Sequence, residues 1–394
     1  MAAMGRPVRA TGLAMIAVLI AACGPNASAA AKPRPSATPG PTTTALGAIA
    51  YLQPASASFL DDRHGWVVGH ACDAQGNCRP GVAETTDGGA TWNELAAPPQ
   101  RPMPAGQDPW PSTAAIRFTS LTDGWLFSPF LAHTVDGGGT WTMVSVPAGN
   151  LVTDVVTFDA SIWAVMNCSA ETPCAATLWR VFPAGDPLQP VGGLPADPGT
   201  QALVAGSRLF LYGPSAEQPG YLAVTSDGRS WAHVQSPCAR ASQQLGSSPS
   251  GNLIDVCWEA VGGGWGPKAA WSSTDGGSHW KLKSRSAGFA SGAGPVGKIP
   301  QTGYPNDIAM PTALDAWMSL GRENLYETHD GGITWAASAV PGQFGGNAGG
   351  AEQVNFVDAQ HGWARSSGGL FRTTDGHTWS RVNILGPVPG YDAP

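Results

Sequence analysis

The sequence predicts an all-β fold, a seven-bladed β-propeller with four-stranded blades. Two recurring motifs and the turn residues between them lead to this prediction. The first motif contains an aspartate, one or two glycines and a closing tryptophan, and it occurs six times, as in TTDGGATW at residues 85–92. Motifs that recur at a fixed period are the sequence pattern of repeat architectures, and four short strands per unit are typical of a propeller blade.

The number of blades follows from the spacing of these motifs. The closing tryptophans recur roughly every 50 residues, as expected for one blade each, except for a gap of about two periods between Trp141 and Trp231. We place one faded copy in this gap, at residues 178–190, which makes seven units. Six or eight blades stay open as alternatives if this unit is misassigned, and either end of the chain is a candidate for the strand that closes the ring.

A second motif precedes most copies of the first motif, which we call boxes, by one hairpin, as in FLDDRHGW and FVDAQHGW. Its closing tryptophans are Trp66, Trp125, Trp163, Trp317 and Trp363. In the first unit an apolar residue, a turn, an alternating apolar stretch, a second turn and a further apolar stretch come before the box. This order predicts four short strands separated by turns.

The residue types of the first motif have a structural reason. A short aspartate side chain accepts hydrogen bonds from backbone N–H groups of its own turn, glycines adopt positive φ, and the tryptophan covers the turn. The predicted structural pairs are Asp87 and Trp92, Asp136 and Trp141, Asp227 and Trp231, Asp275 and Trp280, Asp330 and Trp335, and Asp375 and Trp379. Because a residue repeated in every blade serves a purpose that every blade shares, we interpret these carboxylates as structural and not catalytic.

These boxes resemble the Asp-box (BNR) repeats of sialidases, sortilin-type receptors and related propellers. With the F-x-D-x-x-x-G-W strands, residues 51–388 are most similar to the Ycf48-like photosystem II assembly factor family. The resemblance implies boxes on the outer rim, ligands at the channel mouth and a basic patch on one face. Arg63, Arg117, Arg322 and Arg365 lie beside the second motif and are the candidates for such a patch. A photosystem role does not follow, because propellers host many functions.

The N-terminal segment predicts export. Arg6 and Arg9 precede a short apolar run, which is the pattern of a signal peptide over residues 1–22. The sequence LIAAC that ends at Cys23 resembles the bacterial lipobox, which implies cleavage before Cys23 and a lipid on its sulfur. We therefore expect a lipid-anchored protein on the extracytoplasmic face of the cell membrane. The alternative is a soluble secreted protein cut near Ala22.

Two further segments have compositions that cannot build a core. Residues 23–50 are rich in Pro, Ala, Ser and Thr, so we expect a disordered tether between the lipid and the propeller. Residues 389–394 form a short tail.

Without Cys23, the chain retains six of its seven cysteines. We predict the disulfides Cys72–Cys78, Cys168–Cys174 and Cys238–Cys257, since an exported protein meets an oxidising compartment. Free buried thiols are the alternative. No cysteine pair has a zinc spacing and no histidine pair has a chelating spacing, so no metal site is predicted. The box histidines His133, His279, His329 and His377 are interpreted as turn residues.

The net charge and the missing motifs argue against several kinds of partner and enzyme. The net charge of −7 argues against nucleic acid or anionic lipid as a general partner. No nucleophile elbow, zinc-protease motif or P-loop is present, and the G-x-G-x-x-G match at residues 292–297 lies in a Gly/Ser-rich stretch without a strand before it. We therefore predict no cofactor and no catalytic residue.

A sialidase-like glycoside hydrolase is the enzymatic alternative that the resemblance raises. Such enzymes clamp the substrate with arginines and pair a tyrosine with a glutamate, in addition to an acid/base carboxyl group. The resemblance implies an Arg-Ile-Pro-like signature ahead of the first box. The nearest match is KIP at residues 298–300, which has lysine where a guanidinium is required. Tyr326 with Glu323 or Glu327 is the candidate nucleophilic pair. Our preferred interpretation of these residues is structural.

The parts that differ between blades are the predicted binding parts. Residues 98–112, 239–252 and 284–305 are long connections rich in Pro, Gly or Ser, and long loops in a tight repeat often carry function. The candidate ligand-binding residues are Arg101, Trp110, Trp265 and Tyr304. Alternatively, these aromatic residues pin their loops to the body. We expect a non-catalytic propeller that binds a protein or envelope component as a scaffold or assembly factor, with glycan binding or hydrolysis as the alternative.

Overall fold

The computed structural model divides the chain into two units, residues 1–45 and 46–394. The first unit lies outside the described residues, and with it the predicted signal peptide, Cys23 and most of the tether. The structure describes residues 48–96, 114–128, 130–147, 150–168, 178–181, 188–191, 194, 200–213, 220–238, 241–259, 266–289, 294–321, 324–341 and 351–389. In these ranges, no helix is long and apolar enough to cross a membrane.

The second unit is all-β and has seven antiparallel sheets of four strands. The strands of the first three blades are β1 (Ile49–Phe59), β2 (Gly65–Asp73), β3 (Cys78–Thr85) and β4 (Asn93–Glu94); β5 (Ala115–Phe118), β6 (Gly124–Phe127), β7 (Leu131–Thr134) and β8 (Thr142–Val144); and β9 (Asn150–Phe158), β10 (Ser161–Cys168), β11 (Leu178–Val181) and β12 (Gln189–Pro190). Those of blades 4 and 5 are β13 (Gln201–Ala205), β14 (Arg208–Gly213), β15 (Tyr221–Thr225) and β16 (Ala232–His233); and β17 (Ser242–Ser247), β18 (Leu253–Trp258), β19 (Lys268–Ser273) and β20 (Lys281–Arg285). Those of blades 6 and 7 are β21 (Tyr304–Ala309), β22 (Ala316–Gly321), β23 (Leu325–Thr328) and β24 (Ala336–Ala337); and β25 (Ala351–Phe356), β26 (Gly362–Ser366), β27 (Gly369–Thr373) and β28 (Trp379–Val382).

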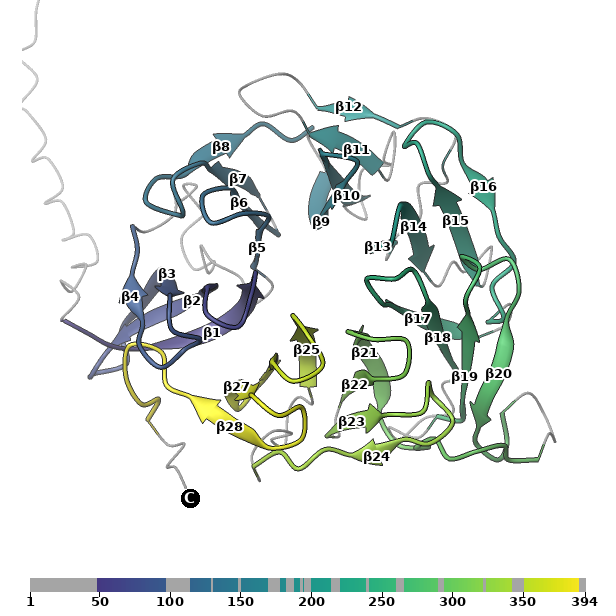
Figure 1. Ribbon diagram of the computed structural model, residues 1–394. Coiled ribbons are helices and arrows are strands. Elements are labelled where there is room, and N and C mark those ends of the chain that lie inside the picture. The colour runs from purple at the N-terminus through teal and green to yellow at the C-terminus, as the bar shows by residue number, and fades with distance from the viewer. Residues whose placement is uncertain are drawn as a thin grey trace, which may run out of the picture. The chain divides into compact units, whose positions relative to one another are not determined.

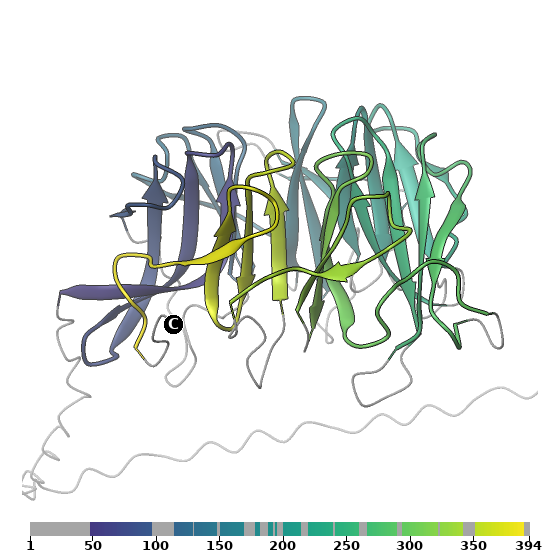
Figure 2. The same ribbon diagram turned by 60° about the horizontal axis from the view of Figure 1, so that its bottom comes forward.

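The predicted seven-bladed propeller is confirmed. Figure 1 shows the sheets arranged in a ring, with the first strand of each blade nearest the centre and the fourth on the outside. Viewed more from the side in Figure 2, the inner strands stand upright along the ring. The faded copy predicted at residues 178–190 corresponds to the outer strands β11 and β12 of blade 3.

The ring closes without exchanging a strand, because each sheet contains four consecutive strands. Neither end of the chain supplies a separate closing strand among the described residues. Instead, the backbone N–H of Leu52 in blade 1 donates to the carbonyl of Ile384 after blade 7 (2.8 Å). The side-chain oxygen of Gln353 in β25 accepts from the N–H of Ala57 in β1 (3.2 Å). Closure therefore rests on hydrogen bonds between the first and last blades and on packing.

The second motif supplies that packing. A Cβ on Gly124 would lie 2.5 Å from the ring of Phe118, so glycine is the residue that lets this ring lie flat over β6. Trp66 of blade 1 stacks on the other side of Phe118, with centroids 3.8 Å apart and planes 9° apart. The same arrangement joins blades 6 and 7 through Trp317 and Phe356, and blades 7 and 1 through Trp363 and Phe59. The apolar core accordingly lies between blades, where residues of neighbouring sheets form shared clusters.

We expect Gly124→Ala to destabilise the propeller by about 1–3 kcal/mol, the usual cost of overpacking a core. Phe118 cannot move away because Trp66 covers it. Chemical denaturation of the purified protein measures this difference. Gly294→Ala is the matched control, because a Cβ there meets no atom within 4 Å. Equal denaturation midpoints for the two variants would contradict the role given to Gly124.

Two of the three predicted disulfides are confirmed. Cys72–Cys78 closes the hairpin between β2 and β3, and Cys238–Cys257 ties the end of blade 4 to β18 of blade 5. The side chains of the third predicted pair, Cys168 and Cys174, lie outside the described residues.

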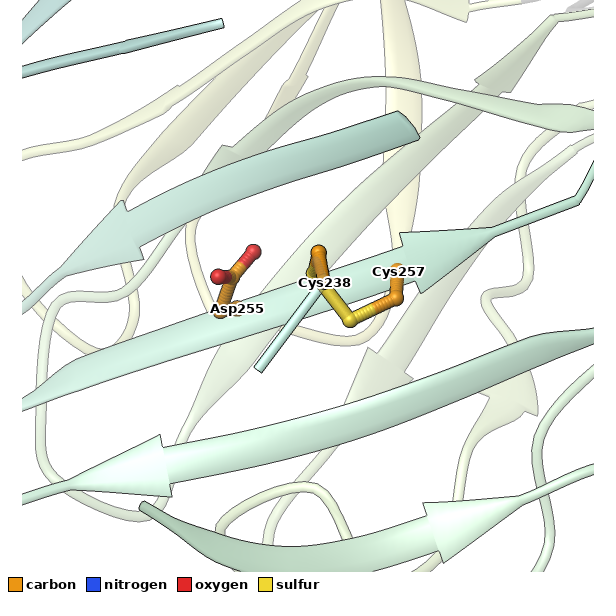
Figure 3. Close-up of side chains that lie close together, drawn as sticks. All are labelled: Cys238, Asp255 and Cys257. Carbon is orange, nitrogen blue, oxygen red and sulfur yellow. A yellow bond between two sulfur atoms is a disulfide. The ribbon is translucent and has the colours of Figure 1, made fainter. Parts of the chain in front are cut away.

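Asp255 lies beside the Cys238–Cys257 disulfide on β18 (Figure 3). Its side chain is fully buried. One oxygen accepts a hydrogen bond from the hydroxyl of Ser236 (3.1 Å), and the other has no hydrogen-bond partner among the described residues. Burial raises the pKa of Asp255 to about 7. The sulfurs are bonded to each other, so this Cys–Asp–Cys group does not offer the thiolates that a metal ion requires.

We expect Asp255→Asn to be more stable than the parent protein at pH 8, and we expect this difference to become smaller as the pH falls toward 4. A carboxyl group whose pKa is higher in the folded state favours folding when protonated. The parent protein therefore loses stability as the pH rises from about 4 to about 7, whereas asparagine does not ionise. Denaturation midpoints measured from pH 5 to pH 8 test this, and parallel curves for the two proteins would contradict it.

Candidate ligand-binding channel

The Asp-box turns are closed by their own side chains. In the first box, Asp87 Oδ1 accepts from the N–H of Thr91 (2.8 Å), and Asp87 Oδ2 accepts from the Thr91 hydroxyl (2.6 Å). Gly88 and Gly89 have φ values of 73° and 95°. The hydrogen bonds from Thr91 lower the pKa of Asp87 to about 2. A carboxylate that is ionised at neutral pH and accepts hydrogen bonds from its own turn fits a structural role.

The remaining boxes repeat this pattern. Each aspartate accepts from backbone N–H groups that follow it in the turn, at Asp136, Asp227, Asp275, Asp330 and Asp375. The preceding blade also contacts some of these turns. Trp66 Nε1 donates to the carbonyl of Gly137 (3.0 Å), and Arg372 donates across the ring closure to the carbonyl of Gly88 (2.5 Å). The boxes therefore also belong to the contacts between blades.

The box tryptophans lie against these turns to different depths. Trp335 and Trp379 are buried, whereas Trp92, Trp141, Trp231 and Trp280 are half-buried. Trp92 donates to the carbonyl of Gly89 and contacts Phe59 edge-on.

A cavity of about 350 Å³ lies at the centre of the ring, where inner strands of six blades meet. Apolar residues such as Leu203 and Met310 form part of its wall. Its polar wall residues include Arg117, Asp154, Gln201, Tyr212, Asp307 and Gln353. We consider this central channel to be the candidate site, because chemically distinct side chains from separate blades converge there.

Arg117 and Asp154 form an ion pair in the channel wall. Arg117 Nη2 lies 3.2 Å from Asp154 Oδ1, and the arginine side chain remains 42% exposed. Burial raises the pKa of Asp154, and the positive charge of Arg117 opposes that rise. The N–H of Val155 also donates to Asp154 Oδ1 (2.8 Å). The Asp154 carboxylate is thus fixed by hydrogen bonds within the channel wall, whereas part of the Arg117 guanidinium remains accessible to a ligand.

Asp307 joins two blades from inside the channel. Its Oδ2 accepts from the N–H of Val354 in blade 7 (3.0 Å), and its Oδ1 accepts from the N–H of Ile308 (2.9 Å). Burial raises the pKa of Asp307 to about 6, although both hydrogen bonds act in the opposite direction. This carboxyl group also lines the central cavity.

Among the described residues, no carboxylate is hydrogen-bonded to the Tyr212 hydroxyl, as a nucleophilic tyrosine would require. Its hydroxyl donates to Gln201 Oε1 (2.7 Å) and accepts from Gln244 Nε2 (2.9 Å). Burial, followed by the charges of Asp307 and Asp154, raises the pKa of Tyr212 well above its usual value. The phenol therefore stays protonated and is hydrogen-bonded to amides.

The arginines named as a basic patch are only partly brought together. Arg117 and Arg365 line one cavity of about 290 Å³ together with Glu352, which forms an ion pair with Arg365. Arg63 lies instead in the turn between β1 and β2, where its carbonyl accepts from Gly88 of the first box. Arg322 lies outside the described residues. The described part of the chain thus places two of these arginines together, with acidic groups beside them.

Of the two Tyr–Glu pairs named for the enzymatic alternative, the one that the structure describes, Tyr326 with Glu327, is not assembled. Tyr326 lines a separate cavity with Lys298 and Pro300. Glu327 is the next residue of β23, so its side chain points to the opposite face of the sheet. There it accepts hydrogen bonds from Trp317 Nε1 (3.2 Å) and the Ser338 hydroxyl (2.7 Å). Glu323 lies outside the described residues.

Of the four predicted binding residues, Tyr304 is the one that the structure describes. It begins β21, is half-buried, and its ring lies beside Gly266. It is not among the residues that line the central cavity. Arg101, Trp110 and Trp265 lie outside the described residues. The sequence did not point to the channel residues because Asp154, Tyr212 and Asp307 belong to no recurring motif.

Solved structures with this architecture are the informative comparison. Neither protein-family models nor curated proteins gave a match. The fold is similar to that of YCF48. A YCF48 structure with a bound D1 peptide is 18% identical, with a TM-score of 0.54, and the match covers 83% of this chain and 94% of that one. YCF48 from Cyanidioschyzon merolae is 14% identical, with a TM-score of 0.52 and coverage of 83% and 96%.

An ancestral GH74 enzyme also shares the fold. It is 12% identical, with a TM-score of 0.58, and the match covers 85% of this chain but 47% of the enzyme. At these identities, the YCF48 and GH74 likenesses concern the fold alone. What the channel does has to be argued from its side chains.

Proposed function

We propose that this propeller binds a segment of a protein partner in its central channel and acts as an extracytoplasmic scaffold or assembly factor without catalysis of its own. The observation that carries the proposal is the state of the channel side chains. Asp154, Asp307 and Tyr212 are occupied by hydrogen bonds within the wall, whereas Arg117 is 42% exposed. Such a wall offers contacts to a ligand without a free nucleophile–base pair.

An extended peptide suits this wall. The exposed guanidinium of Arg117 can donate to peptide carbonyls, and the amide side chains at the cavity both donate and accept. Leu203, Val204 and Met310 add apolar surface beside these polar groups. The fold likeness to YCF48, whose structure holds a D1 peptide, supports a protein segment as the ligand.

Glycan hydrolysis is the second candidate, and one observation favours it. Asp154 and Asp307 line the same cavity, and both have raised pKa values. Many glycoside hydrolases use one protonated and one ionised carboxyl group across the scissile bond. Against this role, both carboxylates accept backbone hydrogen bonds that hold the wall together. We therefore rank binding above hydrolysis.

Site-specific photocrosslinking on intact cells tests the binding proposal. A benzophenone amino acid at Leu203, which lines the central cavity, is expected to capture one discrete protein. The same group at Val135, a 68% exposed residue of the second Asp-box, is the matched control and should not capture it. Mass spectrometry of the adduct identifies the partner and the crosslinked segment.

The outcomes separate the two candidates. Absence of a protein adduct at Leu203, or the same adduct at Val135, would contradict peptide binding in the channel. Recovery of envelope glycan without protein would favour the second candidate. Hydrolysis of a glycoside panel that is lost in Asp307→Asn would then establish it.

We further propose that Cys23 carries a lipid that holds the propeller at the membrane. The motif LIAAC at residues 19–23 and the Pro/Ala/Thr-rich residues that follow it support this. We expect Cys23→Ser to release the protein from the membrane fraction into the medium or a soluble fraction. Fractionation and immunoblotting measure the distribution. Retention of the variant in the membrane fraction would contradict lipid anchoring.

A further inference from the structure

Three side chains from two blades meet on the Asp-box rim. Glu327 lies in β23, His329 follows it in the box turn of blade 6, and His377 lies in the box turn of blade 7. One potential ligand atom from each residue lies within 4.8 Å of the others. The sequence predicted no metal site because the two histidines have no chelating spacing. Their proximity comes from the packing of blade 6 against blade 7.

The distances suit one small cation. Glu327 Oε1 lies 3.7 Å from His329 Nε2 and 3.5 Å from His377 Nδ1. Two ligand atoms that are each bonded to a tetrahedral zinc ion lie about 3.4 Å apart, given bond lengths of about 2.0–2.2 Å. The ligand atoms of His329 and His377 lie within 4.8 Å of each other, so side-chain rotation has to bring these two imidazoles closer for all three ligand atoms to bind one ion.

Neighbouring groups orient these ligands as in known metal sites. Asp315 Oδ1 lies 2.8 Å from His329 Nδ1 and can accept a hydrogen bond from a proton-bearing Nδ1, which leaves Nε2, 3.7 Å from Glu327 Oε1, as the ligand atom. Trp317 and Ser338 both donate to Glu327 Oε2, which leaves Oε1 for the ion. Carboxylate support of a histidine ligand and hydrogen-bonded carboxylate ligands are typical of the outer shell of metal sites.

We propose that Glu327, His329 and His377 bind one divalent transition-metal ion of the zinc class between blades 6 and 7. Two imidazoles and a carboxylate are the donors that zinc accepts, and three protein ligands leave a fourth position for water or another ligand. The His329 and His377 side chains are 41% and 62% exposed, so the ion can enter from solvent. The bound ion adds a link between two blades that are already joined by packing and by the hydrogen bond from Val354 to Asp307.

Titration calorimetry of the full-length protein with ZnCl₂, purified without a histidine tag, tests the proposal. We expect one zinc ion per chain, and at least a tenfold loss of affinity in His377→Ala. His279→Ala is the matched control, because His279 is also an exposed box histidine beside a carboxylate but belongs to no described three-ligand group. This control should bind zinc as the parent does.

A positioning variant and a spectroscopic readout complete the experiment. Asp315→Asn should lower zinc affinity, since it weakens the hydrogen bond that orients His329. Cobalt(II) should give visible absorption bands of a low-coordinate site, and these should be lost in His377→Ala. His377→Gln replaces the alanine variant if circular dichroism shows that the latter is misfolded. Zinc binding that is absent, or equally weak in the parent, His377 and His279 variants, would overturn the proposal.

Discussion

Packing between blades is the constraint on which the rest of the structure depends, and at three junctions a tryptophan from one blade stacks on a phenylalanine of the next. A four-stranded blade cannot bury its apolar faces alone, so it is stable only against its neighbours. Trp66 and Phe118 provide this contact between blades 1 and 2, and Trp363 and Phe59 repeat it where the ring closes. Because the closing contact has the same form as the internal one, the ring needs no exchanged strand.

Packing between blades also determines where polar groups can lie. The inner strands face the channel, where a short distance separates the backbones of neighbouring blades. Side chains therefore bridge them: Asp307 accepts from Val354, and Gln353 accepts from Ala57. The channel carboxylates therefore have a structural role, because they accept backbone hydrogen bonds that hold the channel wall together. This is the physical reason for ranking a binding role above hydrolysis, since a catalytic acid must be free to exchange its proton with substrate.

Local features and the Cys238–Cys257 disulfide between blades 4 and 5 were predictable from the sequence, but the side-chain contacts between blades in the channel were not. The Asp-box turn follows from Asp87 and the positive φ of Gly88 and Gly89, all within one turn, and the motif period located blade 3 despite its faded box. By contrast, the pairing of Arg117 with Asp154 joins residues of different blades and belongs to no recurring motif. Such pairs depend on how much each blade is rotated and shifted against the next, which a repeat pattern does not encode.

The box histidines show how a repeated element acquires individual chemistry. Among the described residues, the His279 side chain contacts the carboxylate of Asp275 in its own turn, at 2.6 Å. His329 occupies a comparable turn but contacts Asp315, and Glu327 lies between it and His377 of the next blade. The two histidines stand at different positions of this turn, His329 directly before its aspartate and His279 four residues after it, so they face different neighbours. In a propeller the shared residues build the scaffold, so specific chemistry has to arise where blades differ and where two of them meet.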